Sequence, residues 1–326
     1  MKSTIICCFS LLVVWQECVA WDPMTATPML RASVGPFPEN GSKDIEISSL
    51  VVTRSGYLLM GNSAHGGDLK MVPLNDPHNI QTRSQGRAHG VASMALLSDD
   101  QVALTTTNVN RLYIFNVSDG VLGWYEDMNL LDYDHHYHAV TDGPNGNVVV
   151  AGGGWRGASG YVDIVTRKGK LVRNLVSNLT DFDPEQMTSF GGDVYVSSSY
   201  SSEPGLLGFN VESGEVIESI GAFNFSDDQR DLFDPYTSTF GQGAFDGAGN
   251  LYIAAFSASC RANGEKTNFC VLLITPEGET RRLISGTKWV KKAMAVALTP
   301  TGLAVAWRID IRGRMHAAVE LYDMVD

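Results

Sequence analysis

Short strands with alternating apolar and polar residues recur along the chain. In each copy, an apolar strand leads into a turn that contains Gly, Asp or Asn, and a second apolar strand follows. The first apolar residues after these turns are Tyr57, Val102, Val148, Val194, Leu251 and Leu303. Their spacings of 45, 46, 46, 57 and 52 residues predict six units of similar size. Such regular spacing is typical of a repeat array.

A third and a fourth strand follow within the units. The third and fourth strands are joined by Gly-containing turns such as 117–120, 167–170 and 276–279. Four antiparallel strands joined by short turns are typical of one propeller blade. No stretch of ten or more residues keeps a 3.6-residue apolar period, which argues against an α/β fold. We predict an all-β, six-bladed β-propeller with blades starting near residues 44, 88, 136, 184, 240 and 290.

The last unit is one strand short. We predict that residues 29–34 supply its outer strand, because pairing the two ends of the chain would cover an open sheet edge. The alternative is that residues 21–40 form a loose tail, as chain termini often do.

The first twenty residues have the pattern of a secretory signal peptide. Lys2 precedes an apolar stretch at residues 5–15. Small residues, Cys18 and Ala20, occupy the two positions that a signal peptidase recognises, so we expect cleavage after Ala20. The alternative is an N-terminal membrane anchor or a buried helix, but the apolar run is shorter than the roughly 18–20 residues that span a bilayer. The mature chain would then be one propeller domain, residues 21–326, which we expect to be secreted or in the lumen of the secretory pathway.

Removal of this peptide changes the cysteine count. Of the five Cys residues, only Cys260 and Cys270 remain, and in an oxidising compartment we predict that they form one disulfide. Asn-x-Ser/Thr sequons, which predict N-glycosylation of a secreted chain, stand at Asn40, Asn116, Asn178 and Asn224.

The composition and the net charge limit the classes of partner that the chain could bind. The 326 residues are 44% apolar, which is too many for a disordered chain, and carry a net charge of −12. That charge argues against nucleic acid as a partner, and no second apolar run reaches the length of a membrane span. We expect a monomer that binds an extracellular ligand of unknown identity.

The residues 132–138 are the densest chemical feature, with three His and two Asp. Imidazole suits zinc and carboxylate suits calcium. On a strand, His136 and His138 would share one face, with His135 and Tyr137 on the other. The alternative is that these polar side chains bond to the backbone and hold the blade in place.

Two loops predicted on the same end of the propeller carry residue types that anchor partners. Trp155 and Arg156 stand in a Gly-rich loop, and Tyr200 stands in a Ser-rich one. We predict that these three residues bind a ligand. The alternative is that Trp155 packs back onto its own blade.

The repeats resemble those of NHL and senescence-marker/gluconolactonase-like six-bladed propellers. The resemblance rests on NVNRLYIFNVSDG at 108–120 and FDGAGNLYI at 245–253. It implies a divalent cation, calcium or zinc, held near the channel by one side chain per blade. The positions that match such ligands are Glu46, His138 and Glu185, with His89 and His136 as further metal ligands in a zinc site like that of amidating-lyase propellers.

Two functions follow as hypotheses. The first is a secreted propeller that binds a protein, peptide or glycan on its channel-mouth loops. The alternative is a divalent-metal-dependent hydrolase, such as a lactonase, or a lyase, with Glu46, Asp134 or Glu185 as metal ligand or base. The first is favoured because the cation ligand set is incomplete: no Asn stands at the corresponding places of the second and third blades.

Overall fold

The fold is built almost wholly from strands. The computed structural model describes residues 21–37, 45–64, 68–83, 90–98, 100–106, 110–118, 121–129, 135–154, 158–179, 182, 184–198, 206–217, 239–256, 260, 269–286, 291–311 and 314–326. The strands are β1 (Thr27–Phe37), β2 (Ile47–Val52), β3 (Tyr57–Asn62), β4 (Leu69–Pro73), β5 (Gln81–Arg83), β6 (Val91–Leu96), β7 (Gln101–Thr106), β8 (Arg111–Ser118), β9 (Val121–Asn129), β10 (His135–Asp142), β11 (Val148–Gly154), β12 (Ala158–Val165), β13 (Leu171–Leu179), β14 (Pro184–Phe190), β15 (Asp193–Ser198), β16 (Leu206–Asn210), β17 (Val216–Ile217), β18 (Thr239–Phe245), β19 (Leu251–Phe256), β20 (Phe269–Ile274), β21 (Thr280–Ser285), β22 (Lys291–Thr299), β23 (Gly302–Ile311) and β24 (Arg314–Val325). A single turn of 3-10 helix covers Pro144–Gly146.

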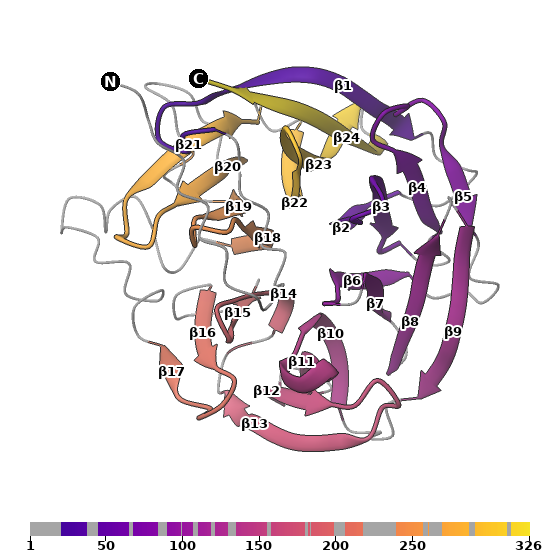
Figure 1. Ribbon diagram of the computed structural model, residues 1–326, viewed down its shortest axis with the longest axis vertical. Coiled ribbons are helices and arrows are strands. Elements are labelled where there is room, and N and C mark those ends of the chain that lie inside the picture. The colour runs from indigo at the N-terminus through magenta and orange to yellow at the C-terminus, as the bar shows by residue number, and fades with distance from the viewer. Residues whose placement is uncertain are drawn as a thin grey trace.

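The sheets surround a common axis, and the predicted all-β propeller is confirmed. Four sheets have four strands each, in chain order: β2–β5, β6–β9, β10–β13 and β14–β17. A fifth has eight strands in the order β1-β24-β23-β22-β18-β19-β20-β21. Its two halves pair at one position, Gln242 with Ala295. Figure 1 shows β2, β6, β10, β14, β18 and β22 nearest the axis, and each of these inner strands contacts the next around a closed ring.

The turns follow the residue preferences that the repeats predicted. Between β10 and β11, Asn145 and Gly146 have φ values of 57° and 74°, the left-handed region that Asn and Gly adopt most readily. The strands that these turns connect bury their apolar residues between neighbouring sheets. In one such cluster, Val149 and Val162 of one sheet pack with Met187 and Val196 of the next. The core is therefore a series of apolar layers between successive sheets.

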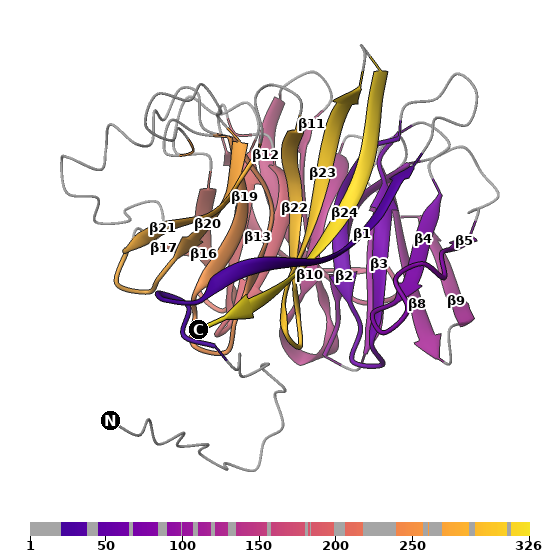
Figure 2. The ribbon, with the colours of Figure 1, turned by 90° about the horizontal axis from the view of Figure 1, so that it is seen from above.

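The first strand joins the two ends of the chain. β1 pairs antiparallel with β24, from Thr27 opposite Val325 to Phe37 opposite Ala317, and Figure 2 shows the two strands together. Val34 and Phe37 are buried in the core on one face of β1, whereas Met29 is 58% exposed. The predicted outer strand at residues 29–34 is thus confirmed, and it extends further in both directions.

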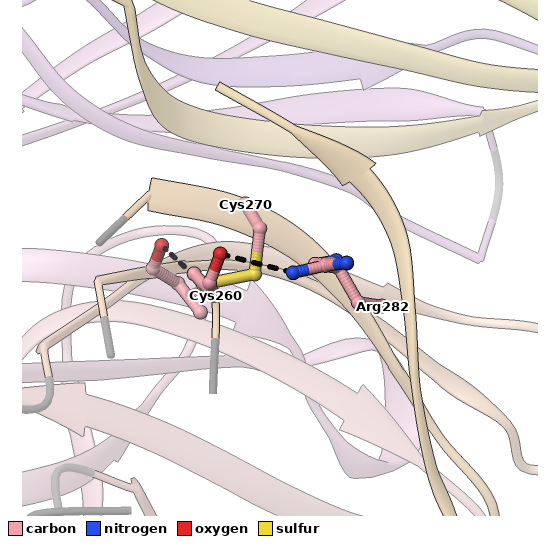
Figure 3. Close-up of a disulfide and its surroundings, with 4 residues drawn as sticks. Cys260, Cys270 and Arg282 are labelled. Atoms are coloured by element: carbon pink, nitrogen blue, oxygen red, sulfur yellow. Dashed lines mark hydrogen bonds between the residues drawn. A yellow bond between two sulfur atoms is a disulfide. The ribbon is translucent and has the colours of Figure 1, made fainter. Parts of the chain in front are cut away.

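The predicted disulfide is also confirmed. Cys260 and Cys270 are bonded, with their Cα atoms 5.3 Å apart, and both are fully buried. Arg282 donates a hydrogen bond to the carbonyl oxygen of Cys260 at 3.3 Å (Figure 3). The bond therefore ties the residues after β19 to the start of β20 within the core of their sheet.

Several predictions about processing are not tested by the structure. Residues 1–20 and the sequons at Asn40 and Asn224 lie outside the described residues. Asn116 lies in β8 and Asn178 in β13. No helix in the described ranges is both long and apolar enough to cross a membrane. The signal peptide and the glycosylation sites stay predictions.

Buried tyrosines make the fold sensitive to alkali. Burial raises the pKa of Tyr195 to about 12, and the nearby Asp193 carboxylate is the smaller of the two causes. Burial also raises the pKa of Tyr252 and Tyr322 above their usual value. Because the folded state holds these phenol protons more tightly than the unfolded chain, the resulting stability is complete below pH ~10 and is lost as pH rises toward 12.

We therefore expect the free energy of unfolding to fall above pH ~10, by about 1.4 kcal/mol per pH unit for each such tyrosine. Denaturant unfolding between pH 9 and 12 measures this slope. Tyr195→Phe should make it shallower, and an unchanged slope in that variant would contradict the assignment to Tyr195.

Candidate functional site

Each inner strand carries a β-bulge close to its beginning. The strand registers shift at this point in β2, β6, β10, β14, β18 and β22 alike. A bulge adds one residue to its strand and redirects the side chain there. The bulged residues are Ser48, Ala92, His138, Glu185, Gly241 with Gln242, and Met294.

These bulges build one cavity at the axis. Ser48, Ala92, His138, Glu185, Gly241 and Met294 all line a cavity of about 360 Å³ at the beginnings of the inner strands. Each inner strand thus contributes its bulged residue to the same wall. In a regular strand, successive side chains point to opposite faces of the sheet. A bulge interrupts this alternation and redirects one side chain, so the bulges are the local feature that shapes the site.

Charged side chains from the first and last sheets around the axis form one side of the cavity. Arg308 Nη1 lies 3.2 Å from Glu46 Oε1, with about a third of each side chain exposed. Glu46 is positioned by its backbone: its N–H donates to Asn62 Oδ1 at 3.0 Å, and its carbonyl accepts from Ser63 N–H at 2.8 Å. Lys292 Nζ lies 4.8 Å from the centre of the Phe269 ring.

The other side carries His138 and Glu185, on the successive inner strands β10 and β14. The rings of His136 and His138 stack with their centres 6.5 Å apart. Tyr137 lies on the opposite face, where its hydroxyl donates to Asp163 Oδ2 at 2.9 Å. His138 lines the cavity, whereas His136 does not.

Two glutamines cross the axis beneath this cavity. Gln242 Oε1 accepts from Leu50 N–H at 2.6 Å and from Ser49 Oγ at 3.0 Å, and its Nε2 donates to the Met94 carbonyl at 3.1 Å. Gln186 Nε2 donates to the Ala92 carbonyl at 2.8 Å. These bonds join β18 and β14 to inner strands that are not their neighbours in the ring.

A second cavity, of about 540 Å³, lies at the far ends of the inner strands. Gln186 lines the first cavity and Gln242 lines the second. The glutamine layer therefore lies between the two cavities, and a ligand in the first cavity would rest above it.

The structure brings together three of the residues predicted for the site: Glu46, His138 and Glu185 line one cavity. His136 is described but does not line this cavity. The remaining predicted site residues lie outside the described residues: His89, Asp134, Trp155, Arg156 and Tyr200. Their roles stay predictions.

Sequence reasoning missed Arg308 and the two glutamines. Each bulged position lies nine or ten residues before the first apolar residue after the turn of its unit. An alignment of the six units on that residue would therefore have marked the ring of bulged positions.

The described residues do not fit the divalent cation that the resemblance implies. The ring of bulged residues has one carboxylate, Glu185, and Glu46 is already paired with the Arg308 guanidinium. Within the described residues, no group of three or more His, Cys, Asp or Glu side chains is placed to hold a metal ion. Calcium takes six to eight oxygen ligands, and this set falls well short of that number.

The similarity of this chain to known proteins lies in its fold. No model of a protein family and no curated protein matches the sequence. Solved structures do match in fold. Regucalcin from Agrobacterium tumefaciens, a calcium-binding protein, has a TM-score of 0.57 at 14% identity, over 91% of this chain and 95% of its own.

Two enzymes have a similar fold. A catalytically inactive virginiamycin B lyase from Staphylococcus aureus with quinupristin has a TM-score of 0.56 at 12% identity, over 91% of this chain and 99% of its own. A luciferin-regenerating enzyme has a TM-score of 0.55 at 10% identity, over 86% of this chain and 92% of its own. At 10–14% identity this likeness concerns the fold alone, and in fold the predicted resemblance is confirmed.

Proposed function

We propose that this protein is a secreted β-propeller that binds an extracellular ligand in the cavity at the beginnings of its inner strands. The observation that carries the proposal is the set of six bulges, each of which turns one residue into the same cavity. Its volume of about 360 Å³ lies within the ~300–1,000 Å³ range of small-molecule sites. The ligand is therefore a small molecule, or the end of a peptide or glycan.

We also propose that the eight-stranded sheet comprises two blades, which makes the propeller six-bladed. Its halves are joined at one parallel position, whereas pairing within each half is antiparallel and continuous. Each half has four strands, and each contributes one bulged inner strand to the ring.

A variant that fills the cavity tests the binding function. Ala92→Phe places a ring at a bulged position, and Ala248→Phe adds the same ring at an exposed turn outside the cavity. We expect small molecules that raise the Tm of the wild-type protein to lose this effect in Ala92→Phe and to keep it in Ala248→Phe. Equal stabilisation of both variants would contradict a site in this cavity.

A lyase or hydrolase is a second candidate, favoured by His138 and Glu185 on successive inner strands of one cavity. Imidazole and carboxylate are the groups that most often transfer protons in enzymes. The virginiamycin B lyase, similar in fold, is an enzyme of this class. Metal analysis of the purified protein tests the metal-dependent form: stoichiometric calcium or zinc, lost in Glu46→Gln and His138→Ala, would support it.

A further inference from the structure

We propose that the ligand of this cavity is a small organic carboxylate, whose anionic group binds beside Lys292 and Arg308 and whose apolar body lies against Phe269 and Met294. This inference rests on the proposed binding function and names the class of its ligand.

The first observation is a pair of like charges. Lys292 of β22 and Arg308 of β23 are directly opposite each other in the antiparallel ladder, and both line the cavity. Like charges at directly opposed positions destabilise a sheet. Glu46 offsets part of this cost at Arg308, and an anion bound beside Lys292 would offset the rest.

The second observation is that the Glu46 carboxylate pairs with Arg308 and leaves the charge of Lys292 without an ion pair among the described side chains. Glu46 pairs with Arg308 at 3.2 Å. Among the described side chains, no carboxylate forms an ion pair with Lys292, whose ammonium instead lies over the Phe269 ring. Within the described part of the chain, this wall therefore carries one cation in excess, with Glu185 on the opposite side of the cavity, although the whole chain has a net charge of −12. A local excess of positive charge in an acidic protein favours an anionic ligand at this wall.

The third observation concerns the surface beside the cations. The Phe269 ring, the bulged Met294 and Ala293 line the cavity next to Lys292. These three side chains give the wall an apolar part beside its cations. A carboxylate with an aromatic or aliphatic body matches both parts of this wall, because guanidinium and ammonium groups donate charge-assisted hydrogen bonds to carboxylates.

Three sets of probes test the ligand class. Benzoate and hexanoate are compared with benzamide and hexanamide, which keep the body and lose the charge, and with benzylamine and hexylamine, which reverse it. Dissociation constants are measured by ligand-observed NMR at low and high salt. We expect the carboxylates to bind about tenfold more tightly than the amides, and the difference to shrink as salt screens the charges.

Two substitutions should change the affinity for carboxylates in opposite directions. Lys292→Met keeps the length and the contact with Phe269 but removes the charge, so the preference for carboxylates should disappear. Glu46→Gln releases Arg308 from its ion pair, so carboxylates should bind more tightly. The matched control is Lys70→Met: Lys70 Nζ also lies over a phenylalanine ring, Phe37 at 5.3 Å, but outside the cavity, and its loss should leave the preference unchanged.

The outcomes separate this inference from the proposed function. Amides or amines that bind at least as tightly as carboxylates, and that lose binding in Ala92→Phe, would overturn the carboxylate class and leave the binding site in place. Weaker carboxylate binding in Glu46→Gln would also overturn it. Failure of all three sets to bind the wild-type protein would overturn both.

Discussion

A chain that begins at residue 38 is expected to melt about 10 to 20 °C below a chain that begins at residue 21. The difference is the loss of β1 and the segment before it. Val34 and Phe37 of β1 are buried in the core. Trp21 is buried against strands β19 and β20, in the other half of the eight-stranded sheet. Burial of each such side chain stabilises a fold by about 1.5–3 kcal/mol, so their joint loss approaches the whole stability of a domain.

The contacts of this segment explain why the loss should spread beyond one strand. The Trp21 indole N–H donates to the Tyr252 hydroxyl at 3.4 Å, and Arg281 donates to the Pro23 carbonyl at 3.0 Å. Residues 21–37 therefore bind both halves of the eight-stranded sheet and cover the edge of β24. Without them, that edge is free to pair with other chains.

The controls separate the strand from its individual residues. Arg31→Ala removes an exposed ion pair with Asp323 at 3.4 Å and should cost less than about 1 kcal/mol. Phe37→Ala should cost about 3–5 kcal/mol. A synthetic peptide of residues 21–37 added to the shortened chain should restore much of the lost Tm. Equal melting temperatures of the two chains, measured by calorimetry, would show that β1 does not close the propeller.

Gln242→Leu is expected to lower the free energy of unfolding by about 3–5 kcal/mol, although leucine has a similar volume and suits a buried site. Gln242 is 6% exposed and satisfies three groups across the axis: the Leu50 N–H, the Ser49 hydroxyl and the Met94 carbonyl. Leucine would leave all three buried without this partner, and each unsatisfied group costs about 1–3 kcal/mol. Denaturant unfolding measures the change.

Gln186→Leu is the matched control. Gln186 is 7% exposed and also crosses the axis, but the one hydrogen bond of its side chain in the described structure goes to the Ala92 carbonyl, which also accepts from Ser48 Oγ at 3.4 Å. Gln186 Oε1 is buried and has no hydrogen-bond partner among the described residues. Its removal should therefore cost about 1 kcal/mol or less. Equal costs for the two variants would contradict the role of Gln242 as the tie across the axis.

The fold was largely predictable because its signals are local. A turn needs residues such as Asn145 and Gly146 at its left-handed positions, and an antiparallel strand alternates in burial, so both leave marks at short range in the sequence. The pairing of β1 with β24 was predictable for a related reason: the last unit lacked a strand, and an unpaired edge is unfavourable.

The candidate site was predictable only in part. Glu46, His138 and Glu185 were found because they match the cation ligands that the resemblance implies, just before or at the start of predicted inner strands. Arg308 was missed because it lies in β23, the second strand of its unit, about 260 residues from the Glu46 that it pairs with. The bulges were missed because a one-residue shift of register depends on the partner strand, and no single strand records it.

By itself, the sequence determined the strand repeat, the turns, the cysteine pair and the strand that joins the chain ends, because each follows from backbone preference or from counting within a unit. Only the tertiary structure decided that six bulged residues face one cavity, that Lys292 opposes Arg308, and that Gln242 ties three strands across the axis. These features arise when distant strands meet around a closed ring. Contacts of that kind depend on the distances between strands, which the order of residues along one strand does not contain.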